Sequence, residues 1–201
     1  MDHLVRTPLA TLLDQIAAKA PTPGGGAVAG IVGALGCALG EMVVAYSLGK
    51  KSMAEHQSHL ELEAGRLVVL RGECLRRAEA DAAAYARLNT LQRLPADHPT
   101  RATEFLEALH DAIAVPMGLA GVCAETLDAL VGLAGRSNPF LKSDLAIAGV
   151  LALAGAEAAR WNVVVNLTDL AADEREAKRT EIDAIVDRCA SAKSNLDSLC
   201  A

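Results

Sequence analysis

Four pairs of polar residues lie within or beside strongly apolar stretches of the sequence. A buried polar group without a partner costs free energy, so each of these groups needs either a structural partner or a ligand. A carboxylate, an ammonium group or an amide in such surroundings can exchange a proton or orient a bound molecule. The pairs are Lys50 with Lys51, Asp81 with Tyr85, Ser143 with Asp144, and Asn162 with Asn166.

Each pair also has a purely structural explanation. The serine and aspartate can cap the helix that they begin, where a carboxylate interacts well with the helix dipole. The two asparagines are one helical turn apart and can hydrogen-bond a neighbouring helix. The aspartate and tyrosine can lie on a solvated face, and the two lysines can simply end a helix. The residues alone leave both kinds of explanation open.

Metal ligands are sparse in this sequence. His56 and His59 have half of a zinc-type spacing but lie in a charged segment. Glu107 and His110 form half of the motif of di-iron bundles, which need the same motif on a second helix. The sequence therefore predicts no metal site and no cofactor.

One stretch, residues 21–51, dominates the chain. It opens with Pro-Thr-Pro-Gly-Gly-Gly and continues as an apolar run whose only charge before Gly49 is Glu41. Small residues recur at four-residue spacing, which lets helices pack closely. We expect a buried central helix of a soluble bundle, with Thr22 as its N-cap and Pro23 at its first position, and no membrane span. The bare backbone of Gly24–Gly26 could meet the polar atoms of a ligand.

The remaining sequence has helical periodicity throughout and no strand pattern. We expect an amphipathic helix over residues 4–19, a long one over 52–94, and two short ones divided at Pro116. A second apolar helix, capped by Ser143, should cover 144–168, and a charged helix should cover 169–199. The prediction is a single domain, residues 1–201, folded as an all-α antiparallel up-and-down bundle of six to seven helices with two apolar central helices.

Composition indicates which classes of partner and which cellular compartment to expect. The net charge is −6 and only 2% of the residues are aromatic, which argues against nucleic acid as a partner. The five cysteines are widely spaced and form no CxxC motif, as expected for reduced thiols. The first residues do not form a signal peptide. We expect a cytoplasmic protein.

Taken together, several motifs resemble the cyclodeaminase/cyclohydrolase family of folate enzymes. The resemblance spans nearly the whole chain in the family's order, although Ala27 stands where serine is frequent. The motifs are PTPGGG at 21–26, LGKK at 48–51, DAAAY at 81–85, VP at 115–116, SD at 143–144 and NVVVNL at 162–167.

The resemblance implies one of two reactions on a folate. A cyclohydrolase adds water to 5,10-methenyltetrahydrofolate and gives 10-formyltetrahydrofolate; a cyclodeaminase releases ammonia from 5-formiminotetrahydrofolate and gives the methenyl compound. Both pass through a tetrahedral carbon and need a proton acceptor and a proton donor, without a metal. A chain without a fused transferase domain favours the cyclohydrolase. The family also implies a homodimer with the folate site close to the subunit interface.

The resemblance implies roles for the polar pairs. Lys50, Asp81 and Asp144 are the predicted catalytic residues, with the division of work between the two carboxylates left open. The glycines would offer backbone N–H groups to the pterin or to the oxygen of the intermediate. The predicted substrate-binding residues are Pro23, Gly24, Gly25, Gly26, Lys51, Tyr85, Ser143, Asn162 and Asn166.

Overall fold

The computed structural model describes residues 4–201, and within them every regular element is helical. This confirms the all-α prediction. The α-helices are α1 (Leu9–Ala17), α2 (Gly25–Ala45), α3 (Gln57–Gln92), α4 (Pro99–Leu133), α5 (Lys142–Asn166) and α6 (Ala172–Cys200). Short 3-10 helices join them: η1 (Leu4–Arg6), η2 (Lys51–His56), η3 (Pro139–Leu141) and η4 (Leu167–Asp169).

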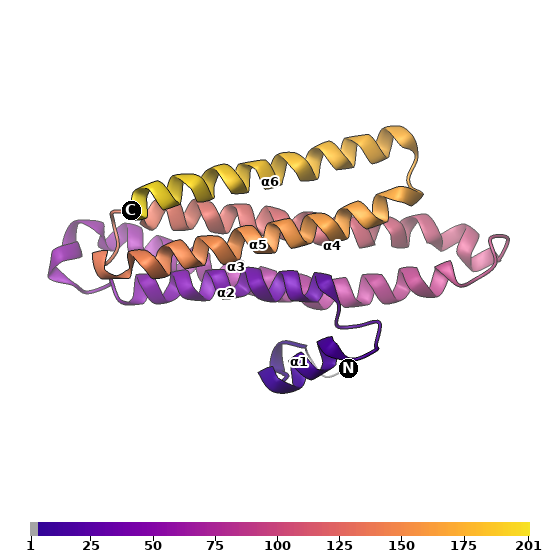
Figure 1. Ribbon diagram of the computed structural model, residues 1–201, viewed down its shortest axis with the longest axis horizontal. Coiled ribbons are helices and arrows are strands. Elements are labelled where there is room, and N and C mark those ends of the chain that lie inside the picture. The colour runs from indigo at the N-terminus through magenta and orange to yellow at the C-terminus, as the bar shows by residue number, and fades with distance from the viewer. Residues whose placement is uncertain (1–3) are drawn as a thin grey trace.

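The long helices run up and down along one axis (Figure 1). Helices α2, α3, α4 and α5 each pack on the next, and α2 also packs on α5 to close the group. Helix α6 covers α4 and α5, while α1 lies beyond α2, on the side away from α6. The core between the helices consists of leucine, alanine, valine and cysteine side chains. The two apolar helices of the sequence prediction, α2 and α5, therefore do pack against each other.

Small residues bring α2 and α5 into close contact. A Cβ added at Gly36 would meet the carbonyl oxygen of Ala148 at 2.9 Å, and one added at Gly155 would lie 3.2 Å from the backbone of Gly33. Since these neighbours are backbone atoms, a side chain here would force the helices apart. The glycine stripe therefore serves helix packing. It also fixes the antiparallel register, in which the start of α2 lies beside the end of α5.

Pro116 does not divide the fourth helix, so the predicted break there is wrong. Helix α4 continues through it from Pro99 to Leu133. A proline inside a helix removes one N–H donor and pushes away the carbonyl four residues earlier, here that of Ala112. That carbonyl accepts a hydrogen bond from Asn166 of α5 instead, at 3.2 Å. A partner from a neighbouring helix thus replaces the lost bond within α4.

The predicted N-caps of the two apolar helices are also wrong. Helix α2 begins at Gly25 with Gly24 as its N-cap, so Thr22 and Pro23 lie before the helix. Helix α5 begins at Lys142, and Ser143 lies inside its first turn without a capping hydrogen bond. The reason at α5 is that η3 runs directly into it, so the first turn is already formed. At α2 the N-cap is Gly24, whose backbone is extended and which has no side chain that could accept a capping hydrogen bond.

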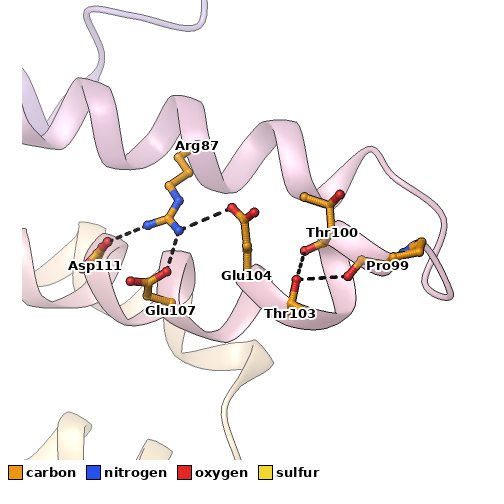
Figure 2. Close-up of polar contacts among 7 residues, drawn as sticks. All are labelled: Arg87, Pro99, Thr100, Thr103, Glu104, Glu107 and Asp111. Carbon is orange, nitrogen blue, oxygen red and sulfur yellow. Dashed lines mark hydrogen bonds and ion pairs between the residues drawn. The ribbon is translucent and has the colours of Figure 1, made fainter.

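Figure 2 shows how the far ends of α3 and α4 are joined. The guanidinium group of Arg87 on α3 binds the carboxylates of Glu107 at 2.6 Å and Asp111 at 3.2 Å, and lies 3.5 Å from that of Glu104. The hydroxyl of Thr103 donates to carbonyl oxygens in its own first turn rather than capping the helix. Glu107, half of the possible di-iron motif, is therefore engaged in an ion pair.

Among the described residues, three stretches are long and apolar enough to cross a membrane, judged by length and composition: Gly25–Ala45, Pro99–Leu133 and Pro139–Asp169. In the bundle they differ in how far they are covered. The most apolar part of the second is 67% buried, whereas that of the third is only 33% buried. In the first, Glu41 forms an ion pair with Arg71 of α3 at 2.6 Å. The outer face of α5 is thus apolar and largely uncovered.

Candidate active site

A cavity of about 410 Å³ lies where α2 begins, between α3, α4 and the end of α5. Its size suits a bound small molecule. Seven of the predicted site residues line it: Gly24, Gly25, Gly26, Asp81, Tyr85, Asn162 and Asn166. The structure therefore brings together residues that are as much as 142 positions apart in the sequence.

Asp81 lies directly against the first turn of α2. A Cβ added at Gly26 would overlap the carboxyl group of Asp81, so only glycine leaves room for this arrangement. The carboxyl is half-buried, and its burial raises the pKa of Asp81 above the ordinary value of an aspartate. A carboxyl group with a raised pKa can both hold and release a proton at moderate pH. Asp81 is thus the group in this cavity best placed for proton transfer.

The two asparagines present their side-chain oxygens for binding. The Nδ2 amide of Asn166 donates to the carbonyl oxygens of Ala112 at 3.2 Å and Asn162 at 2.9 Å. That of Asn162 donates to the carbonyl oxygen of Ala158 at 3.2 Å. Because these bonds use the N–H groups, each Oδ1 remains to accept a hydrogen bond from a ligand, and that of Asn162 points toward Gly25.

The charged side chains that line the cavity are acidic. Among the described residues that line it, Asp81 and Asp169 carry carboxylates and none is a lysine or arginine. Tyr85 and Val165 add half-exposed apolar surface at its edge. Such a lining suits a flat, partly apolar molecule with a positive centre and hydrogen-bond donors.

The other predicted site residues lie elsewhere. Pro23 adjoins the cavity without lining it. Lys50, Lys51, Ser143 and Asp144 lie at the opposite end of the bundle, after the end of α2 and at the start of α5. The length of α2, 21 residues at about 1.5 Å each, separates the two groups by roughly 30 Å. Within one chain the predicted site residues therefore form two groups at opposite ends of the bundle.

Three polar lining residues that lie outside the motifs were missed in the sequence: Gln92, Thr168 and Asp169. Thr168 and Asp169 directly follow the Asn-Val-Val-Val-Asn-Leu motif, so their position was a usable signal. No sequence signal pointed to Gln92. It lies at the end of a long charged helix, and nothing in the sequence shows which face of that helix meets the cavity.

The described residues include no group of three histidine, cysteine or carboxylate side chains that could hold a metal ion. His59 bonds the carbonyl oxygen of Gly132, and His110 lies 3.0 Å from the carboxylate of Glu174. One histidine of each possible metal motif is thus engaged by a protein group.

Comparison with known proteins identifies the family. Residues 8–184 match the model of the formiminotransferase-cyclodeaminase family. The chain belongs to this family. It is an enzyme of a family of folate one-carbon metabolism, and this membership implies a folate derivative as substrate.

Two kinds of relative share the fold of this family member. The methenyltetrahydrofolate cyclohydrolase of Methylorubrum extorquens is 35% identical over 85% of this chain and 86% of its own length. The formimidoyltransferase-cyclodeaminase of Sus scrofa is 31% identical over 87% of this chain, which spans 33% of that longer protein. The crystal structure of formiminotetrahydrofolate cyclodeaminase from Thermotoga maritima superposes with a TM-score of 0.90 at 26% identity, over 98% of this chain and 96% of that one. The resemblance drawn from the motifs is confirmed.

Proposed function

We propose that the protein hydrolyses 5,10-methenyltetrahydrofolate to 10-formyltetrahydrofolate. The observation that carries this proposal is the half-buried Asp81 against the bare start of α2, in a cavity with carboxylates and no lining cation. The methenyl carbon between N5 and N10 carries delocalised positive charge, which this lining stabilises. The near full-length similarity to the cyclohydrolase of Methylorubrum extorquens supports the same reaction.

The residues of the cavity suit the steps of this hydrolysis. A water molecule adds to the methenyl carbon while the Asp81 carboxylate accepts one of its protons, which gives a neutral tetrahedral intermediate. The backbone N–H groups at the start of α2 stabilise its oxygen. The C–N5 bond then breaks as the hydroxyl group releases its proton to solvent water, N5 takes up the proton that Asp81 had accepted, and the formyl group remains on N10. The Oδ1 atoms of Asn162 and Asn166 accept hydrogen bonds from the N–H groups of the pterin.

The second candidate reaction is the cyclodeamination of 5-formiminotetrahydrofolate. It is favoured by the crystal structure of the Thermotoga maritima cyclodeaminase, whose chain this one matches over nearly its whole length. The same carboxyl group would serve, because N10 attacks the formimino carbon and the departing ammonia needs a proton. The proposal further includes a cytoplasmic homodimer that uses no metal or cofactor.

The first experiment is a spectroscopic assay with 5,10-methenyltetrahydrofolate. We expect the purified protein to accelerate the loss of the near-ultraviolet absorbance of this compound over the uncatalysed rate. Ammonia release from 5-formiminotetrahydrofolate, without loss of the methenyl compound, would identify a cyclodeaminase instead. Inactivity in both assays would refute the proposed function.

Pro116 should matter for substrate binding although it lies outside the cavity. In a Pro116→Ala variant the restored N–H draws the carbonyl of Ala112 back into α4 and away from Asn166. We expect an unchanged or higher unfolding temperature and a KM raised about fivefold, the scale of one lost hydrogen bond, with little change in kcat. Steady-state kinetics and thermal unfolding check this; an unchanged KM would contradict it.

A further inference from the structure

We infer that Asp169 recognises the pterin ring of the substrate and so fixes the direction in which the folate lies in the cavity. In this arrangement its carboxylate accepts two hydrogen bonds, from the 2-amino group and from the adjacent N3–H group of the pterin. The inference deepens the proposed function, on which it rests for the choice of ligand. It assigns a role to a carboxylate that lines the cavity and that the proposed reaction does not use.

The 3-10 helix η4 holds Asp169 at the cavity. This helix follows directly on α5, and the two leucines that flank its polar residues, Leu167 and Leu170, are buried in the core. The turn is therefore fixed to the core on both sides of Thr168 and Asp169, which line the cavity. A side chain on a fixed turn keeps its position, as a residue that selects a ligand requires.

The carboxylate of Asp169 is available to a ligand. Among residues 4–201 no group forms a hydrogen bond or an ion pair with it. Other carboxylates at the same end of the bundle are engaged, because Glu107 binds Arg87 and Glu174 lies 3.0 Å from His110. A carboxylate in a cavity wall that has no protein partner offers both of its oxygens to a bound molecule.

Asn162, Asn166 and Asp169 form one row of hydrogen-bond acceptors along the wall of the cavity. Their spacing of four and then three residues keeps them on one side of the chain as α5 passes into η4. With a rise of 1.5 Å per residue in an α-helix and 2.0 Å in a 3-10 helix, the row is roughly 10 Å long. Such a row suits a flat fused-ring molecule with N–H donors along its edges, as a tetrahydropterin has.

The carboxylate at the end of this row matches the donor pair at the end of the pterin. The 2-amino and N3–H groups are neighbouring, parallel donors, so the two oxygens of one carboxylate can accept both bonds, as they do from the guanidinium group of an arginine. An asparagine cannot do this, because one of its two polar atoms is a donor. Asp169 therefore suits the donor pair, whereas Asn162 and Asn166 suit single N–H groups.

Charge selects the direction of the folate. A Cβ added at Gly26 would overlap the carboxyl group of Asp81, and one added at Gly25 would lie 3.6 Å from Oδ1 of Asn162. Asp81 thus lies at the Asn162 end of the row. With the 2-amino group at Asp169, the reacting carbon lies toward Asp81 and the anionic glutamate tail extends away from Asp169. In the reverse direction the tail would approach the unpaired carboxylate of Asp169, and the like charges would repel.

A ligand without the 2-amino group tests the contact directly. We expect the wild-type protein to bind tetrahydrofolate about tenfold more tightly than 2-desamino-2-methyltetrahydrofolate, because the analogue loses one hydrogen bond to a carboxylate. In an Asp169→Asn variant the affinity for tetrahydrofolate should fall about tenfold, and most of the difference between the two ligands should disappear. Calorimetric titration under anaerobic conditions measures both affinities without relying on catalysis.

Two further variants serve as comparisons for the same titration. Asp173→Asn, at an exposed aspartate in the first turn of α6 outside the cavity lining, should bind both ligands as the wild-type protein does. Asp81→Asn should keep the preference for tetrahydrofolate, because Asp81 lies at the reacting end. A wild-type protein that binds both ligands equally would overturn the inference without any variant. So would a preference that is lost in Asp81→Asn and kept in Asp169→Asn, since that pattern means the reverse direction.

Steady-state kinetics separates this inference from the proposed function. With 5,10-methenyltetrahydrofolate as substrate, Asp169→Asn should raise KM about tenfold and leave kcat nearly unchanged, because the contact lies away from the reacting carbon. Binding that depends on Asp169 and on the 2-amino group, in a protein inactive on both folates, would uphold the inference and refute the proposed function. Hydrolysis with a wild-type KM in Asp169→Asn would refute the inference alone.

Discussion

An Asp81→Asn variant should lose methenyltetrahydrofolate hydrolysis by about a hundredfold or more, since that is the usual contribution of a positioned proton acceptor. The amide has nearly the shape of the carboxyl group and fits the same place against Gly26, but it cannot take a proton from water. The loss should appear in kcat more than in KM. Steady-state kinetics over a range of pH should also show that the acid limb of the wild-type profile, set by the raised pKa of Asp81, disappears in the variant.

The same substitution should not destabilise the fold. Burial raises the pKa of Asp81, so the ionised carboxylate is less favourable in the folded than in the unfolded state. The folded protein therefore loses stability as the pH rises through the ordinary pKa of an aspartate, and the loss is complete above the raised value. We expect Asp81→Asn to unfold at an equal or higher temperature at neutral pH, with the difference vanishing in acid.

Asp97→Asn, at an exposed aspartate in the turn between α3 and α4, serves as the control. It should leave both the activity and the unfolding temperature unchanged. If Asp81→Asn kept full activity with the wild-type acid limb, Asp81 would not be the proton acceptor and the assignment would fail.

A Gly26→Ala variant should be folded and nearly inactive. The added methyl group occupies the space of the Asp81 carboxyl, so the aspartate must turn away while the backbone stays in place. Displacing a catalytic group by about 1 Å can lower a rate a hundredfold. Alanine is also the better helix former by about 1 kcal/mol, so the unfolding temperature should be unchanged or higher. Kinetics and thermal unfolding on the same preparation check the loss of activity and the retained stability.

Gly72→Ala is the matched control, because a Cβ at Gly72 on α3 meets no atom within 4 Å. It should gain the same helix propensity and keep full activity. Wild-type activity in Gly26→Ala would show that the contact between α2 and Asp81 is not needed for the reaction. An unfolded variant would show that the absence of a side chain at Gly26 is required for folding.

The sequence by itself determined the helices and the main functional motifs. The small-residue stripe of α2 predicted close packing, and the Asp-Ala-Ala-Ala-Tyr and Asn-Val-Val-Val-Asn-Leu motifs supplied the polar residues of the cavity. These signals are local, because helical periodicity and one-turn spacings can be read over a few residues. Helix boundaries were less certain: the break expected at Pro116 did not occur, since Asn166, 50 positions later in the chain, satisfies the carbonyl that the proline leaves.

Only the tertiary structure decided which polar residues meet. The antiparallel packing of α2 and α5 places Gly24–Gly26 beside Asn162 and Asn166 and carries Lys50 and Asp144 to the other end. A periodic pattern tells which face of a helix is apolar, but not which end of one helix lies beside which end of another. That choice depends on contacts between distant segments, here the glycines that let two backbones approach, and so the division of the predicted site between the two ends of the bundle became visible only in the folded chain.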